Sequence, residues 1–441
     1  MKLNKKNLIE KDIIKLVKIY SKNKFKKEKF IKGKSIIPAS QKKIDGKEIE
    51  LLVKASLDGW LTSGKFNKKF EKDIVRFLGA KLAITVNSGS SANLVAFSTL
   101  MSEKLKEDRI KEGDEIITVA AGFPTTINPI VINKCIPVFV DINLKTLNID
   151  ESLIEQAITK KTKAIMIAHT LGNPFNLKRI KEICEKNKLW LVQDTCDALG
   201  SKYEDKYVGA YGDIGTVSFY PAHHITMGEG GLIYTNSIRL KRIAESIRDW
   251  GRDCYCEPGM ENTCGKRYCW KLGNLPDGYD HKYIYSHLGY NLKITDMQAA
   301  CGLAQINKLD KFISVRNKNY ELYRNLFKDL EKFFFFQEST SGSSPSWFGF
   351  VLTIRDQRIK RSDLIQYLNK FNIGTRLLFA GNITKQPYFN KIKYKISGVL
   401  NNTDYVMKNT FWVGLHPQIN HEKIKFIYSK IKEYLIVSNL I

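Results

Sequence analysis

The chain has 441 residues, of which 43% are apolar, so it is long enough for a large globular domain and a smaller one. Its formal net charge is +26, but the lysines are spread along the chain without a recognised nucleic-acid motif, and we expect no nucleic-acid partner. No run of 18 apolar residues occurs and charges interrupt the apolar N-terminal residues, so we expect no membrane span, no secretory signal and a cytoplasmic location.

The expected elements, taken in chain order, indicate an α/β fold. Residues 1–35 form a basic arm that we expect to be helical in part. Short apolar runs then alternate with helix-like stretches, which predicts a mostly parallel sheet covered by helices. The expected strands are residues 82–86, 115–119, 137–141, 164–169 and 189–194. One expected helix carries apolar residues at Leu177, Ile180, Ile183 and Cys184, which lie on one helical face.

The chain changes character beyond about residue 300. Lysine-rich helical stretches and a strand near residues 347–354 predict a smaller α+β domain there. We therefore expect a large cofactor-binding domain at residues 36–300, with a cysteine-rich insertion near residues 250–280, and a small C-terminal domain at residues 301–441.

Four separated segments have the chemistry of one cofactor pocket. Residues 87–93 follow a strand and open a helix, where free N–H groups suit a phosphate. Residues 191–194 end a buried strand in a carboxylate, the group that keeps a pyridine ring protonated. Residues 122–126 offer an aromatic ring, and residues 218–231 form a glycine-rich turn. Each segment alone is more often purely structural.

Taken in this order, the segments resemble those of the DegT/DnrJ/EryC1/StrS sugar aminotransferases, and residues 59–64, 137–142 and 288–300 extend the likeness. The resemblance implies a fold-type I pyridoxal phosphate-dependent transferase and a homodimer. It places Gly89, Ser90 and Ser218 at the cofactor phosphate, Phe123 on the ring, Asp194 at the ring nitrogen, Asp197 near the ring hydroxyl, and Asn291 at the phosphate of the other subunit.

The same resemblance puts a histidine in the lysine position of the family. Residues 218–231 match the pattern S-F-x-P-x-K-x-x-T-x-G-E-G-G, with His223 in place of the lysine. A histidine can transfer a proton but cannot form the Schiff base that a lysine forms. We therefore interpret His223 as the general base of an enzyme that uses pyridoxamine phosphate and does not simply transaminate.

Eight cysteines in a cytoplasmic chain favour metal or redox chemistry over disulfides. Cys196, Cys254, Cys256 and Cys264 have the spacing C-x57-C-x-C-x7-C, and Cys269 is a competing fourth ligand. From spacing alone, one zinc ion is at least as probable as two irons. We expect the remaining cysteines to be small buried apolar residues, namely Cys135, Cys184 and Cys301.

The histidine at position 223 and the spacing of the cysteines together resemble the pattern of the iron–sulfur dehydrases of this family. This resemblance implies pyridoxamine phosphate, a [2Fe–2S] cluster on Cys196, Cys254, Cys256 and Cys264, and an NAD(P)H-dependent iron–sulfur flavoprotein reductase as partner. The implied reaction removes the C3 hydroxyl of a CDP-linked 4-keto-6-deoxyhexose, in 3,6-dideoxyhexose and lipopolysaccharide biosynthesis. Two alternatives remain: a dehydratase without a cluster, whose cysteines bind zinc or nothing, and a non-catalytic, cofactor-binding regulator.

Overall fold

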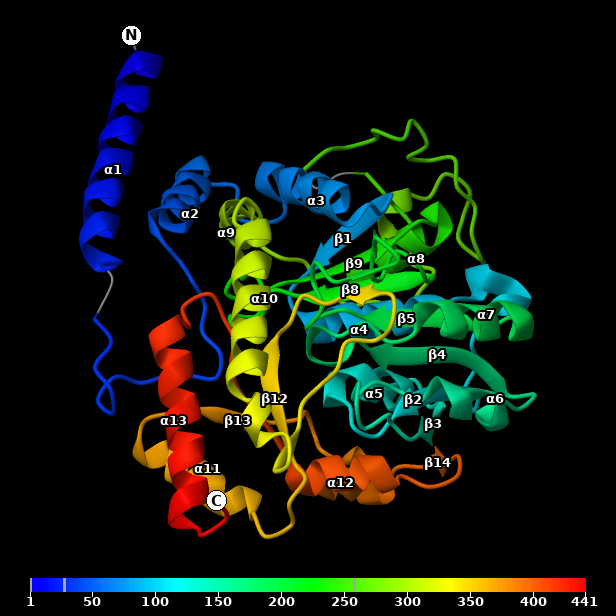
Figure 1. The fold of residues 1–441 in the computed structure, drawn as a ribbon. Coiled ribbons are helices and arrows are strands. Elements are labelled where there is room, and N and C mark those ends of the chain that lie inside the picture. The colour runs from blue at the N-terminus through cyan, green and yellow to red at the C-terminus, as the bar shows by residue number, and fades with distance from the viewer. Residues whose placement is uncertain (1, 27–28, 257–258) are drawn as a thin grey trace.

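A computed structural model describes residues 2–26, 29–256 and 259–441, and its centre is an eight-stranded sheet (Figure 1). β9 runs antiparallel to β1 and β8, and every other neighbouring pair is parallel. The spatial order is β1 (Leu82–Val86), β9 (Gly231–Thr235), β8 (Ile214–Ser218), β5 (Trp190–Asp194), β4 (Thr162–Ala168), β2 (Glu115–Val119), β3 (Ile136–Val140) and β14 (Lys395–Ile396). The expected mostly parallel sheet and its five expected strands are confirmed.

Helices cover both faces of this sheet. Successive residues of a strand point to opposite faces, so both sets of side chains are buried. Ile117, Ile165 and Leu191 belong to a core shared with α7 (Leu177–Asn187). Their sequence neighbours Ile116, Ala164 and Val192 belong to a second core. That second core also contains side chains of α4 (Gly89–Leu100) and α8 (Ile238–Arg248). The near-continuous apolar runs of these strands follow from burial on two sides.

The C-terminal part has its own antiparallel sheet. Its order is β10 (Phe334–Phe335), β12 (Gly349–Ile354), β15 (Thr410–Gly414) and β13 (Thr375–Leu377). The helices that pack on it are α10 (Leu309–Leu326), α11 (Arg361–Lys370) and α13 (His421–Val437). Ile37, far away in the sequence, is buried in the same core.

The remaining elements connect and flank these two sheets. They are α1 (Lys2–Lys24), α2 (Gly46–Asp58), α3 (Lys65–Leu78), α5 (Pro124–Ile132), α6 (Ile154–Ala157), α9 (Asp296–Ile306) and α12 (Asn401–Asn409). A small third sheet joins β11 (Ser343–Ser344), β6 (Lys202–Tyr203) and β7 (Lys206–Tyr207). In the described parts of the chain, no helix combines the length and the apolar character that crossing a membrane requires.

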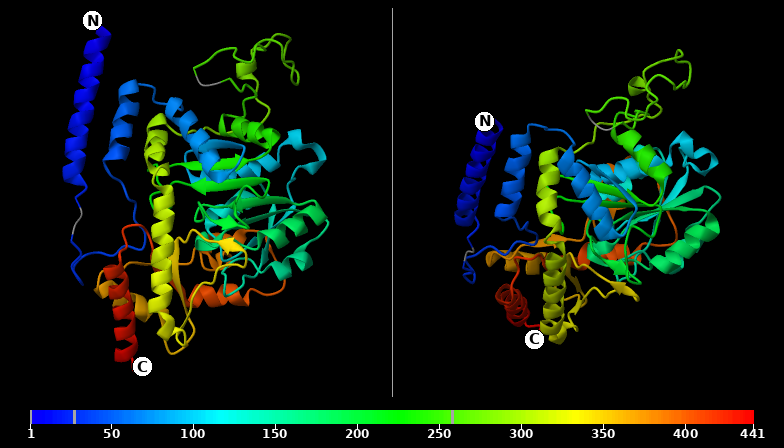
Figure 2. Two further views of the ribbon diagram at one scale, coloured as in Figure 1. Left: turned by 45° about the horizontal axis from the view of Figure 1, so that its top comes forward. Right: turned by 90° about the horizontal axis from the view of Figure 1, so that it is seen from above.

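Two segments project from the body of the molecule. α1 stands at one side, and the chain between α8 and α9 leaves the body as a long loop in both views of Figure 2. Within the described residues of this loop, a single 3-10 turn is formed, at His281–Tyr283. We call residues 250–285 the insertion. Its shape therefore depends on side-chain contacts more than on regular backbone hydrogen bonds.

Candidate active site

A cavity of about 690 Å³ lies where β4, β5 and β8 end. Ala168, Asp194 and Ser218 are the last residues of these strands, and all three line the cavity. Carboxyl ends of parallel strands are where α/β folds bind their ligands. The cavity brings together the sequence-predicted site residues Gly89, Ser90, Phe123, Asp194, Asp197, Ser218 and His223, together with Cys196.

One corner of the cavity is built as an anion site. α4 begins there, with Ser88 as its N-cap, and the first N–H groups of a helix have no partner within the helix. A Cβ on Gly89 would lie 2.4 Å from the Ser218 Cβ, so only glycine lets the helix start approach β8 this closely. The resulting cradle of N–H groups and serine hydroxyls fits a phosphate.

Asp194 is held rigidly at the end of β5. Its side chain accepts hydrogen bonds of 2.7 Å from Asn93 Nδ2 and from Thr126 Oγ1, and one of 3.0 Å from the Cys196 backbone N–H. Sequence reasoning did not single out Asn93 and Thr126, although both lie in segments already recognised. A carboxylate fixed in this way in a cavity fits the ring nitrogen of a pyridoxal-type cofactor.

His223 lies beside the acid that the sequence places near the cofactor hydroxyl. Its Nδ1 is 3.2 Å from an Asp197 carboxylate oxygen, and 17% of its side chain is exposed. Its ring centroid is 5.5 Å from that of Phe348, which supports it on one side. The next residue differs, because His224 is buried and its Nε2 lies 3.0 Å from the Ser346 carbonyl oxygen. Burial keeps the pKa of His224 well below its usual value.

The C-terminal part contributes walls that sequence reasoning did not assign to the site. Arg376, Phe379 and Trp412 line the cavity together with Phe348. The runs at residues 374–382 and 411–417 carried a family likeness, which was the signal available for them. The Phe123 ring is half exposed, lines the cavity and lies 6.3 Å from the Phe379 ring, so part of it is accessible to a flat ligand.

Asn291 is exposed and does not line this cavity. It pairs with Asp249 through an isolated antiparallel bridge, which fixes its backbone near the end of α8. Its expected reach to the cofactor of a second subunit is not tested by a single chain and stays a prediction.

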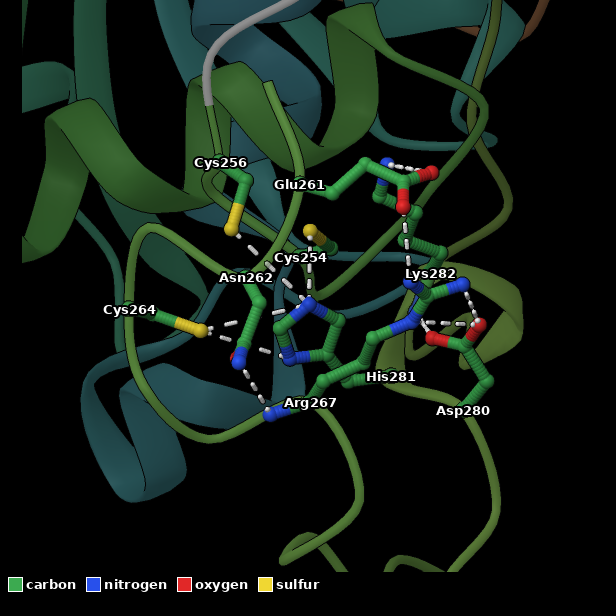
Figure 3. A network of polar contacts seen from close by, with 9 residues as sticks. All are labelled: Cys254, Cys256, Glu261, Asn262, Cys264, Arg267, Asp280, His281 and Lys282. Carbon is green, nitrogen blue, oxygen red and sulfur yellow. Dashed lines mark hydrogen bonds and ion pairs between the residues drawn. The ribbon is translucent and has the colours of Figure 1, made fainter.

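Three of the predicted cysteine ligands lie around a histidine in the insertion (Figure 3). His281 Nε2 lies 3.2 Å from the Cys254 Sγ and 3.9 Å from the Cys256 Sγ, and these three residues could share one metal ion. The Cys264 Sγ lies nearer the other ring nitrogen, 3.6 Å from Nδ1. The Cys256 thiol is partly desolvated, but hydrogen bonds from Thr263 and from the Cys264 backbone lower its pKa to about 6. Sequence reasoning missed His281, because a lone histidine carries no spacing signal.

The fourth predicted ligand, Cys196, follows the end of β5, and its role as a ligand stays a prediction. Cys196 lines the cavity, whereas the other three do not. Burial, together with the neighbouring carboxylates of Asp194 and Asp197, keeps the pKa of its thiol well above the usual value. Cys269 is exposed and is not part of the group around His281. The other cysteines are buried as expected, namely Cys135, Cys184 and Cys301.

The chain resembles known proteins along most of its length. The lipopolysaccharide biosynthesis protein RfbH of Salmonella typhimurium is 54% identical over 429 residues, which cover 97% of this chain and 98% of that protein. The dTDP-4-dehydro-2,6-dideoxy-D-glucose 3-dehydratase of Saccharopolyspora spinosa is 49% identical over 411 residues, 93% of this chain and 89% of that protein.

A solved structure has the same fold. The E. coli GDP-4-keto-6-deoxy-D-mannose-3-dehydratase with bound hydrated PLP is 31% identical, with a TM-score of 0.81 over 90% of this chain and 99% of that one. Residues 42–432 match the family described as DegT/DnrJ/EryC1/StrS aminotransferases. The chain therefore belongs to the DegT/DnrJ/EryC1/StrS aminotransferase family and has its fold-type I architecture.

Proposed function

We propose that this chain is a pyridoxamine phosphate-dependent 3-dehydratase of nucleotide-linked 4-keto-6-deoxyhexoses. The observation that carries the proposal is His223, which lies in the cavity beside Asp197. No lysine is among the described residues that line this cavity, so a base is present but no Schiff-base amine. Relatives with the printed names of sugar 3-dehydratases support the reaction class.

The residues of the cavity divide the chemistry among themselves. When bound, pyridoxamine phosphate supplies an amine for a sugar ketone and a ring that takes up an electron pair. Gly89, Ser90 and Ser218 bind the phosphate at the start of α4, and Asp194 keeps the ring nitrogen protonated. His223 removes the C4′ proton through the nitrogen that does not face Asp197.

For the substrate we propose a CDP-linked sugar, as in a CDP-4-keto-6-deoxyglucose 3-dehydrase. This rests on the histidine and cysteine pattern of the sequence. Arg376 at the cavity supports a nucleotide sugar of some kind, because a guanidinium pairs well with phosphate oxygens. Relatives are named for dTDP- and GDP-linked sugars. The test is therefore a comparison of kcat/KM on CDP-, dTDP- and GDP-4-keto-6-deoxyhexoses, in which the proposal expects the CDP-linked sugar to give the highest value.

For the reductive half of the reaction we propose a [2Fe–2S] cluster in the insertion, reduced by an NAD(P)H-dependent iron–sulfur flavoprotein. The gathering of Cys254, Cys256 and Cys264 supports it. The sequence pattern names Cys196 as the fourth ligand, and this stays a prediction.

We further propose a homodimer with Asn291 at the partner's cofactor. Leu288, near Asn291, is 95% exposed, and an apolar side chain so exposed supports a contact with a second copy.

The first test replaces the proposed base. His223→Asn should keep pyridoxamine phosphate bound but slow deuterium exchange at C4′ and dehydration by about 10²–10⁴-fold, the usual cost of losing a general base. Exchange is followed by NMR of the cofactor in D₂O with substrate present. His224→Gln is the control, because His224 lies outside the cavity and glutamine keeps a donor for the Ser346 carbonyl. Unchanged exchange in His223→Asn would refute the assignment.

A further inference from the structure

The helix α1 carries apolar residues on two faces, and the body of the protein covers only one of them. Ile14 and Ser21 are buried on the covered face, where a Cβ on Gly46 of α2 would lie 2.9 Å from the Ser21 Cβ. The residues of the other face are each more than half exposed, and we call them the free face: Leu8, Ile9, Leu16, Ile19 and Tyr20. Exposed apolar side chains grouped in this way mark a site of contact with another molecule.

The free face continues across the end of α2 to the insertion. Ile9 lines a cavity of about 350 Å³ between α1 and α2, together with the exposed Leu57. Trp60 is exposed too and packs against the insertion, since a Cβ on Gly259 would lie 2.7 Å from its ring. The next residue of the insertion, Met260, is 51% exposed. α1 and the insertion both project toward the top of the two views in Figure 2. We call the free face, Leu57, Trp60 and Met260 together the exposed band.

Lysines surround the exposed band on α1. This helix contains eight lysines but only two acidic residues. Lys5 and Lys15 are exposed, and each lies three or four residues from a member of the free face, so both stand beside it. Charges of one sign at the rim of an apolar surface steer a partner of opposite charge toward it and disfavour other partners. The chemistry of the exposed band therefore fits a protein with an acidic face.

Two other occupants fit the exposed band less well. A second copy paired across it by a twofold axis would bring two lysine-rich helices together, and their charges would repel. A bilayer surface would have to receive the whole free face, and Asp12 lies within this face, four residues from both Leu8 and Leu16. A carboxylate there opposes contact with lipid tails and with anionic headgroups alike.

We propose that the exposed band is the docking surface of an acidic electron-donor protein, which reduces the metal centre of the insertion. The delivery of electrons at this place rests on the proposed function. A donor bound there would contact Met260, in the same insertion as Cys254 and Cys256. In each encounter the donor loses one electron and the centre gains it, and NAD(P)H then reduces the donor again. Two such encounters supply the two electrons of the reductive half of the reaction.

The exposed side chains allow variants that leave the core intact. Leu16→Asp removes an apolar contact of the free face, and the double variant Lys5→Glu/Lys15→Glu reverses two charges beside it. The matched controls are Val437→Asp and Lys425→Glu, because Val437 and Lys425 are also exposed but lie on α13. The probe is a plant-type [2Fe–2S] ferredoxin, a small acidic electron carrier, whose binding is measured by isothermal titration calorimetry.

The wild-type chain should bind the ferredoxin at low salt and lose affinity as the salt concentration rises. Both test variants should bind it about ten-fold more weakly, because they lose an apolar anchor or the attraction of two rim charges. The control variants should bind as the wild type does. Reduction by ferredoxin should slow by a similar factor in the test variants. Dithionite is small and needs no docking, so it should reduce every variant at the wild-type rate.

Failure of this proposal can be told apart from failure of the proposed function. Exchange at C4′ reports on dehydration and should be the same in all five proteins. A wild-type chain without a reducible centre would refute the electron relay. A reducible centre, with ferredoxin binding and reduction unaffected in both test variants, would refute only the docking surface.

Two further results would overturn the proposal by identifying another occupant. The first is binding of the wild-type chain to phosphatidylglycerol vesicles but not to the ferredoxin, with loss of vesicle binding in Lys5→Glu/Lys15→Glu. The second is a dimer that sediments as a monomer in Leu16→Asp, while the ferredoxin affinity stays unchanged. Wild-type protein that does not bind the ferredoxin even at low salt would also contradict the docking surface.

Discussion

At the scale of single residues, Asp197 faces one nitrogen of His223. The carboxylate lies 3.2 Å from Nδ1 without forming a hydrogen bond of good geometry, and we propose that a proton on Nδ1 turns toward it in the working enzyme and leaves Nε2 as the base. Arg316 is buried nearby, and its positive charge acts on Asp197. Asp197 is thus a positioning residue for the proposed base.

Replacing this carboxylate tests the tautomer. In Asp197→Asn the amide can donate to Nδ1, which would put the proton on Nε2 and remove the base. We expect about 10²–10⁴-fold slower exchange at C4′, as for loss of the base itself, with little change in cofactor affinity. Exchange is measured by NMR and affinity by the absorbance of the bound cofactor.

The matched control is Asp197→Glu, which keeps an acceptor and should recover part of the rate. The double variant with His223→Asn should be no slower than His223→Asn alone, because both changes remove one function. Multiplicative losses in the double variant would mean that Asp197 acts independently of His223.

Several site residues could be predicted because they lie in recognisable motifs. Others could not, because long-range contacts in the folded chain place them. Gly89, Asp194 and Ser218 lie at strand or helix ends in recognisable segments, and the structure brings them to one cavity. His281 comes from a stretch without periodicity or motif spacing, and Arg376 lies in a run whose family likeness did not mark it as a site residue. The positions of both depend on chain folding over long distances, which one sequence does not encode in any local pattern.

At the scale of elements, the contact between α4 and β8 sets the phosphate corner. Gly89→Ala would put a Cβ 3.0 Å from the Ser218 Cα as well as 2.4 Å from its Cβ, so the helix start must shift. We expect at least a ten-fold loss of pyridoxamine phosphate affinity, because the N–H groups move away from the phosphate. The affinity is measured by cofactor titration.

A glycine far from the cavity is the control. Gly79 has φ +64° and caps α3, and a Cβ there meets nothing within 4 Å. Gly79→Ala should therefore cost about 1 kcal/mol of stability through backbone strain but leave the cofactor affinity unchanged. Equal affinity losses in both variants would mean that Gly89 acts through general stability.

Long buried strands were predictable, whereas the shortest ones were not. β2, β4 and β5 are apolar runs buried on both faces, so their hydrophobicity alone marks them. β14 and β11 have two residues each. Such pieces have no pattern of their own and form because a distant segment offers an edge to pair with.

At the scale of the whole molecule, the proposed composite sites can be tested with mixed dimers. His223→Asn and Asn291→Ala should each be inactive as homodimers if both residues serve every site. In a mixed dimer, one site would combine the intact His223 of one chain with the intact Asn291 of the other. We therefore expect about half of the wild-type activity per mixed dimer, measured after co-expression with two affinity tags. If the mixed dimer recovered no activity, the proposal that each active site contains residues of both subunits would be refuted.

Buried histidines should make the stability depend on pH. Burial lowers the pKa of His169 to about 4 and that of His416 to about 3. In both rings Nδ1 accepts a backbone N–H, from Phe175 and from Gln418 respectively, so both fold in the neutral form. Unfolded histidines bind a proton near pH ~6.5.

The sign follows from these lowered values. The stabilising contribution is complete above pH ~6.5 and is lost as the pH falls toward about 4 and about 3. The two protons of His169 and His416 contribute roughly 2.7 kcal/mol per pH unit to the slope within this window, and buried His224, whose pKa is also lowered, adds to it. Urea unfolding between pH 4.5 and 7 measures it. His416→Gln keeps a donor to the Pro38 carbonyl and should flatten the slope by about one proton, whereas an unchanged slope would contradict the assignment.

The contact between Pro38 and His416 joins residues 378 positions apart, and Ile37 is buried in the C-terminal core beside it. During synthesis, Ile37 leaves the ribosome long before the other residues of this core. It can be buried only after the C-terminal residues of the core have been made and have folded around it. A fragment that starts near residue 300 would expose this apolar site. Ile37 and Pro38 thus depend for their burial and contacts on residues that most of the chain separates from them.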